Sequence, residues 1–125
     1  MTLFMKSSNY IHIHKNFIEA QIDVLFYVED GITYAYAPAL DMLGYGDTQQ
    51  EAKASFEVVF EDFLEFGLKR GTLIPDLEMH GWQQKKTQEY DLPEAWRLFD
   101  HNHQLQQIYS GSFIKESVPV QYAMA

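Results

Sequence analysis

The sequence predicts an α+β fold in which a small antiparallel sheet packs on one long helix, followed by a C-terminal helical extension and a final strand. Apolar residues recur at every second position across residues 18–28, which is the period of a strand with one buried face. Apolar residues recur every three or four positions across residues 52–64, which is the period of an amphipathic helix. The 125-residue chain shows no internal repeat, so we predict one main domain over residues 10–82 and an extension over residues 83–125.

The composition is that of an ordinary globular protein, with 46% hydrophobic and 22% charged residues. The formal net charge is −9, which disfavours nucleic-acid binding because phosphate neutralisation requires a basic surface. The absence of cysteine excludes a disulfide framework and a thiolate metal site. The sequence shows neither a signal peptide nor a segment of transmembrane length, so we expect a cytoplasmic protein with no membrane partner.

Residues 18–28 are expected to form a strand with one buried face. Its apolar positions are Ile18, Ala20, Ile22, Val24, Phe26 and Val28. The intervening positions, which include Asp23 and Leu25, are mostly polar and are expected to face water. Asp30 and Gly31 then predict a turn, because Gly tolerates positive φ and Asp can hydrogen-bond its own backbone. Residues 32–37 are β-branched and aromatic, so they complete a hairpin.

Residues 10–14, before the hairpin, are expected to form a short strand or an extension of the next one. His12 and His14 would share one face of it as half-exposed side chains. A metal ion needs three or four ligands, so these two histidines do not predict a metal site.

A brief strand is expected after the hairpin, over residues 43–46. Pro38 is expected to end the preceding strand or to lie at a sheet edge, because it cannot donate to a ladder. Gly44 and Gly46 would allow close approach of another backbone.

The long helix begins at a capping box in which Thr48 is the N-cap and Glu51 the third helical residue. Gly67 or Gly71 is expected to end it. The predicted buried stripe consists of Ala52, Phe56, Val59, Phe60, Phe63 and Leu64. The opposite side carries the acids Glu57, Glu61 and Asp62.

The pattern after the helix is less regular. Residues 72–82 are expected to turn and then to form a short strand over residues 77–82. Residues 83–90 are polar and indicate a loop or a solvent-exposed edge.

Two short helices and a strand are expected in the extension. The first helix starts near Pro93 and packs through residues 95–99, since proline suits the first helical turn. The second helix spans residues 103–109 and is stopped by Gly111. Residues 112–122 then form a final strand, which Pro119 is expected to interrupt.

Residues 27–65 resemble the N-terminal domain of HicB-type antitoxins. The shared order is a strand, an acidic-Gly turn, a second strand ending in P-x-L, a glycine-containing segment, and D-T-x-x-E-A opening a helix. The pattern falls on Glu29, Asp30, Gly31, Ala35, Pro38, Leu40, Gly44, Gly46, Asp47, Thr48, Glu51 and Ala52. Each piece alone is a common turn or cap, and the order and spacing together make the resemblance specific.

The resemblance implies a three- or four-stranded antiparallel sheet on one helix, described for that family as a partial ribonuclease H-like or double-stranded-RNA-binding-like fold. Such antitoxins mask a small RNA-cleaving toxin and are often dimers or tetramers. We therefore expect a small basic protein toxin as partner, contacted by Glu57, Glu61 and Asp62, and no catalytic residue or cofactor. A small open sheet leaves strand edges to be paired, so a homodimer is also expected. Unlike full antitoxins, the chain has no basic helix-turn-helix or ribbon-helix-helix pattern after Gly71, so operator binding is not implied.

Two alternatives stay open. The first is RNA binding by a local basic strip that comprises Lys69, Arg70, Lys85 and Lys86. The second is a metal-dependent nuclease, because a ribonuclease H-like site needs several carboxylates near strand ends. The candidate carboxylates are Asp23, Glu29, Asp30 and Asp47.

Overall fold

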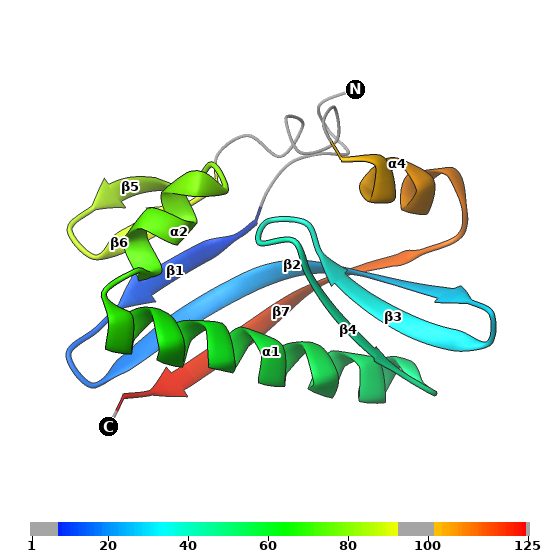
Figure 1. Cartoon of the computed structure of the whole chain (residues 1–125), viewed down its shortest axis with the longest axis horizontal. Coiled ribbons are helices and arrows are strands. Elements are labelled where there is room, and N and C mark those ends of the chain that lie inside the picture. The colour runs from blue at the N-terminus through cyan, green and yellow to red at the C-terminus, as the bar shows by residue number, and fades with distance from the viewer. Residues whose placement is uncertain (1–7, 93–101, 125) are drawn as a thin grey trace.

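A computed structural model describes residues 8–92 and 102–124. In this part of the chain the fold is α+β, with a seven-stranded sheet and helices on both of its faces (Figure 1). The elements in chain order are β1 Tyr10–Ile13, β2 Phe17–Glu29, β3 Ile32–Ala37, β4 Met42–Gly46, α1 Gln49–Arg70, α2 Leu73–Met79, β5 Gln83–Lys86, β6 Glu89–Asp91, α4 His103–Ser110 and β7 Ile114–Ala123. No helix in the described residues combines the length and the apolar character needed to cross a bilayer.

The thirteen-residue strand β2 is the centre of the sheet. One edge of β2 pairs with β7 over ten positions, from Phe17 opposite Ala123 to Phe26 opposite Ile114. Two strands pair with the other edge of β2. Strand β1 pairs with the first half of β2, and β3 pairs with the second half. The described strand pairs are all antiparallel, and β4 and the β6–β5 pair extend the two ends of this shared edge. The predicted extension thus joins the same sheet as the main domain, through β5, β6 and β7.

The α1 side of the sheet holds the main core, as the alternation predicted. The β2 residues Ile18, Ala20, Ile22, Val24 and Phe26 are all buried. Phe56, Phe60 and Leu64 of α1 are fully buried against this face, with the Phe56 and Phe60 rings 6.0 Å apart. Two predicted core positions differ. Val28 is 67% exposed, and Val59 is 36% exposed because it lies at the edge of the buried stripe.

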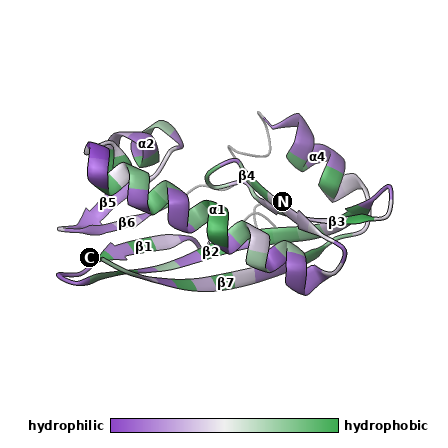
Figure 2. Ribbon diagram, turned by 60° about the horizontal axis from the view of Figure 1, so that its bottom comes forward, coloured by the Kyte–Doolittle hydropathy of each residue, from purple (hydrophilic) through white to green (hydrophobic). Residues whose placement is uncertain are grey.

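The opposite face of β2 does not face water throughout, contrary to prediction. Leu25 and Asp23 are 2% and 5% exposed. The helix α4 covers Leu25 together with Tyr36 of β3, through Leu105 and Ile108. Neighbouring residues of a strand point to opposite faces, so α1 and α4 pack on opposite sides of the sheet. Figures 1 and 2 show the β3–β4 hairpin between the two helices.

The predicted boundaries of α1 are confirmed. The amide of Glu51 donates to Thr48 Oγ1 at 3.1 Å, and the Glu51 carboxylate accepts from the Asp47 amide at 2.9 Å. Gly71 ends the helix in the left-handed region, at φ 68°. The side-chain bonds satisfy two amides at the start of the helix that have no partner within it.

The family-like positions have the expected local roles. Asp30 and Gly31 make the β2–β3 turn with φ of 54° and 78°, and β3 ends at the residue before Pro38. Leu40 is buried in the main core. A Cβ on Gly44 would lie 2.4 Å from the Phe56 amide nitrogen, so only glycine lets β4 approach α1 this closely.

The segment after α1 was predicted wrongly as a turn and a strand. It forms the helix α2, with Leu73 and Leu77 buried. Pro75 lies in the first turn of α2, where its missing N–H would have no helical partner, so it does not prevent a helix. The polar residues 83–86 form the exposed strand β5, which matches the edge alternative. The helix predicted near Pro93, with residues 95–99, lies outside the described residues.

Strand β7 runs through Pro119 without the predicted interruption, with Pro119 opposite Gln21 of β2. Proline fits this edge strand because its nitrogen, which donates no hydrogen bond, can face outward. The other sheet edges are also protected. The four exposed residues of β5 include Lys85 and Lys86, and the Tyr45 amide of β4 donates to Ser55 Oγ at 3.1 Å. Such features oppose edge-to-edge pairing, so the unpaired edge that motivated a homodimer gives that prediction less support.

Candidate functional site

The helix α1 exposes apolar side chains on the side that faces away from the sheet. Val58 and Phe66 are 59% and 56% exposed. They lie in line with Asp62 because residues four apart are neighbours on a helix surface. We define the α1 outer face as Val58, Glu61, Asp62 and Phe66. Large exposed apolar groups beside polar ones are a feature of interaction surfaces.

The three acids predicted to contact a partner lie on or beside this face. Glu61 and Asp62 are exposed, whereas Glu57 is half-buried. The structure therefore brings two of the three carboxylates together with the exposed apolar groups. Sequence reasoning missed Val58 and Phe66 and assigned Val59 to the core. Val58 and Phe66 are eight residues apart with Asp62 midway, which places all three on one stripe of the helix, and this spacing was the signal that could have identified them.

The basic residues of α1 contact neighbouring acidic or aromatic groups. Lys53 Nζ donates to Glu116 Oε1 of β7 at 2.8 Å, and this hydrogen bond raises the pKa of the Lys53 ammonium. Lys69 Nζ lies 3.4 Å from Glu65 Oε1. Arg70 lies over the Phe66 ring at 5.4 Å, so the α1 outer face carries the carboxylates of Glu61 and Asp62 and has one cation at its C-terminal end.

A row of tyrosines crosses three strands on the opposite side of the sheet from α1. Tyr27 of β2 is opposite Tyr34 of β3, which is opposite Tyr45 of β4. The Tyr27 and Tyr34 rings stack with their centroids 5.3 Å apart. Tyr45 is 64% exposed. The two-residue turn at Asp30 and Gly31 sets the Tyr27–Tyr34 pair, so that pair was foreseeable from the sequence, whereas the position of Tyr45 depends on the longer β3–β4 connection.

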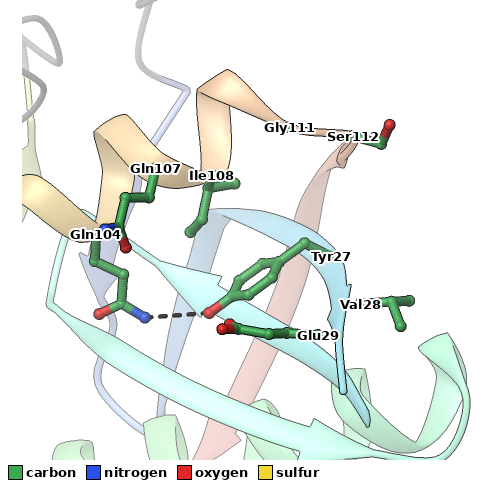
Figure 3. Close-up of a pocket in the computed structure, with 8 residues that line it drawn as sticks. All are labelled: Tyr27, Val28, Glu29, Gln104, Gln107, Ile108, Gly111 and Ser112. Carbon is green, nitrogen blue, oxygen red and sulfur yellow. Dashed lines mark hydrogen bonds between the residues drawn. The ribbon is translucent and has the colours of Figure 1, made fainter. Parts of the chain in front are cut away.

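A hollow of about 440 Å³ lies between the end of β2 and α4. Its lining residues are Tyr27, Val28, Glu29, Gln104, Gln107, Ile108, Gly111 and Ser112. Figure 3 shows Tyr27, Glu29 and Gln104 converging in it, whereas Val28 and Ser112 point away. Gln104 Nε2 donates to the Tyr27 hydroxyl at 3.1 Å. Burial raises the pKa of the Tyr27 phenol above its ordinary value of 10.0.

A hydrogen-bonded group under α4 fixes the position of that helix. The Tyr36 hydroxyl donates to Asp41 Oδ1 at 2.6 Å and accepts from Asn102 Nδ2 at 2.7 Å. Asn102 is also the N-cap of α4, because its Oδ1 accepts from the Leu105 amide at 2.9 Å. Burial raises the pKa of the Tyr36 phenol. A side chain that caps α4 thus also binds the sheet, which places α4 above the hollow.

The carboxylates considered for a nuclease site do not form a metal-binding group. Asp23 is buried and accepts from the Ser8 amide and from Ser117 Oγ, both at 2.9 Å. Asp30 lies in the β2–β3 turn and Asp47 at the start of α1. Among the described residues, no three His, Asp or Glu side chains are placed to hold a metal ion.

Three of the four bases of the predicted basic strip contact other groups of the chain. Lys69 lies near Glu65, Lys85 Nζ lies 3.9 Å from Asp91 Oδ2, and Arg70 lies over the Phe66 ring at 5.4 Å. The two ion pairs reduce the positive charge available for phosphates.

The two strand histidines also lie beside acids. His12 Nε2 is 4.0 Å from Glu89 Oε1, and His14 Nε2 is 3.2 Å from Glu19 Oε1. Their side chains are 34% and 43% exposed, as expected for half-exposed positions.

The chain was compared with family models, with curated proteins and with solved structures, and none of the three comparisons found a match. The assignment of function therefore depends on the geometry of this chain and on the resemblance noted in its sequence.

Proposed function

We propose that this chain is a protein-binding module of the antitoxin type, which docks a small basic RNA-cleaving protein on the α1 outer face. The observation that carries the proposal is the exposure of Val58 and Phe66 on either side of Asp62, with Glu61 beside Val58. Apolar side chains supply burial at the centre of an interface, and acids beside them attract a basic partner and exclude acidic ones. The resemblance of residues 27–65 to HicB-type antitoxins supports the same class of partner.

The position of this surface on α1 supports a binding role. The buried side of α1 is fixed against the sheet by Phe56, Phe60 and Leu64, and its first turn is fixed by the capping box. The outer face is therefore presented by a rigid helix, and a partner does not have to order it on binding. Preorganised surfaces bind with a smaller entropic cost.

The test uses any short basic protein encoded next to this chain, purified and mixed with it. The variant Glu61→Lys should weaken the complex by roughly tenfold at low salt, because reversing a charge places like charges together. Glu78→Lys is the matched control, since it makes the same change at an exposed residue of α2. Phe66→Ala should weaken binding more than Met79→Ala, which removes an apolar side chain that is 76% exposed on α2.

The second measurement is the RNA-cleaving activity of the partner. The wild-type chain should suppress cleavage, and the Glu61→Lys variant should suppress it only at higher concentration. Equal effects of Glu61→Lys and Glu78→Lys would contradict docking on α1. Full cleavage in the presence of saturating wild-type chain would contradict the antitoxin role itself.

RNA binding is a second candidate because of the tyrosine row. Single-stranded RNA is commonly bound by aromatic side chains that stack on unpaired bases across a sheet. Nearby carboxylates oppose this role, because Glu29 and Asp30 lie at the end of β2 next to the row. Filter binding with single-stranded RNA at low salt tests it. Retention that is lost in Tyr45→Ala would favour RNA binding, and no retention would exclude it.

A further inference from the structure

We propose that the hollow between β2 and α4 is a binding subsite for an arginine side chain of a protein partner. The hollow lies on the opposite side of the sheet from the α1 outer face, so this subsite is distinct from the proposed docking helix and does not depend on it. The charge of the lining residues, the groups that converge in the hollow and the shape of a guanidinium all favour this ligand.

The lining of the hollow attracts cations. Glu29 is the only charged residue among the lining residues, and none of them is Lys, Arg or His. Within the described part of the chain, no basic side chain pairs with Glu29. An exposed carboxylate beside a recess, with no counter-ion among the described residues, favours a positively charged group supplied by a ligand.

The neutral groups of the hollow also suit a cation. Gln104 Nε2 donates a hydrogen bond to the Tyr27 hydroxyl. The side-chain carbonyl oxygen of Gln104 remains as a hydrogen-bond acceptor. Tyr27 is held by this bond and by stacking on Tyr34, so its ring has a fixed orientation. Aromatic rings attract cations through their faces. Figure 3 shows Gln104, from α4, and Glu29, from β2, approaching the Tyr27 hydroxyl.

A guanidinium fits these groups better than an ammonium. It is planar and can stack on a tyrosine ring while it donates two parallel hydrogen bonds to a carboxylate. An ammonium is a more strongly hydrated point charge and loses more hydration in such a recess. The size of the hollow, about 440 Å³, falls in the range of sites that bind small ligands.

The test is a titration of the whole chain with N-acetyl-arginine methylamide, followed by NMR of the side-chain amides of Gln104 and Gln107. N-acetyl-citrulline methylamide is the matched neutral probe, because it has nearly the same shape without the charge. N-acetyl-lysine methylamide distinguishes a guanidinium site from a site for any cation. The arginine probe should shift the Gln104 and Gln107 signals at millimolar concentration, and the other two probes should bind more weakly.

Two variants locate the binding. Glu29→Gln should lower the affinity for the arginine probe by roughly two- to fivefold, which corresponds to the free energy of an exposed ion pair. Glu19→Gln is the matched control on the same strand, at a position outside the hollow. Equal binding of the citrulline or lysine probe, or an equal effect of the two variants, would overturn the proposal. These results are independent of the α1 experiments, so either proposal can fail alone.

Discussion

The two sides of the sheet are covered in different ways. On the α1 side, a helix of 22 residues buries an apolar stripe against strands β2, β3 and β4. On the α4 side, a helix of eight residues covers a small cluster around Leu25 and Tyr36 and is positioned by hydrogen bonds. The α1 side therefore provides most of the apolar burial, whereas the α4 side combines modest burial with polar contacts and a hollow.

This difference has a consequence for function. A continuous apolar interface leaves only the far side of α1 available to a partner. The partial cover on the α4 side leaves Glu29 and the tyrosine row accessible next to a helix that is held at a few points. Regions with few buried contacts also open most readily. The two candidate binding surfaces thus differ in rigidity, with the α1 outer face the more rigid.

The largest expected effect tests the α1 side. Phe60→Ala should lower the free energy of unfolding by about 3–5 kcal/mol, because it removes a fully buried ring and leaves a cavity. Urea denaturation followed by circular dichroism measures the change. Phe66→Ala is the control on the same helix and should cost less than about 1 kcal/mol, since Phe66 is mostly exposed. Similar losses in both variants would mean that the two sides of α1 are not as different as the structure shows.

A smaller effect is expected on the α4 side. Leu105→Ala should cost about 2–3 kcal/mol, at the low end for a buried leucine, because its cluster is small. Amide hydrogen exchange should show loss of protection confined to α4, whereas Phe60→Ala should reduce protection across the sheet. Gln107→Ala, at an exposed position of α4, is the control and should leave exchange unchanged. Uniform loss of protection in Leu105→Ala would contradict the comparison.

The smallest effect concerns the hydrogen bonds under α4. Tyr36→Phe should cost about 1–2 kcal/mol, because Asp41 and Asn102 each lose a hydrogen-bond partner. Tyr45→Phe is the control, at a tyrosine that is 64% exposed. Denaturant titrations at neutral pH measure both. Equal stability of the two variants would show that these bonds do not position α4.

Tyr36 should also make the free energy of unfolding depend on pH. Burial raises the pKa of Tyr36 above its ordinary value of 10.0, so above about pH 10 the unfolded chain loses this proton before the folded chain does. The unfolded state then binds fewer protons, and the free energy of unfolding falls as pH rises. Tyr36→Phe should make this fall shallower without abolishing it, because burial also raises the pKa of Tyr27 and Tyr109. An unchanged slope would contradict the assignment.

Local patterns in the sequence determined much of the fold. The period of two along β2, the capping box at Thr48, the turn at Gly31 and the end of α1 at Gly71 are all present in the structure. Each of these features depends on residues close together in the chain, so its physics is contained in a short segment. The exposure of Glu61 and Asp62 follows in the same way from the helical period.

Only the tertiary structure decided which surfaces meet. It placed β7 along β2, where the Ser117 hydroxyl donates a hydrogen bond to Asp23, 94 residues away in the sequence. It also placed α4 on the face of the sheet that the alternation had assigned to water. It therefore buried Leu25 and formed the hollow beside Glu29. The alternation along a strand predicts that one face is buried, but it does not predict which distant segment covers the other face. That choice depends on packing and loop closure over the whole chain.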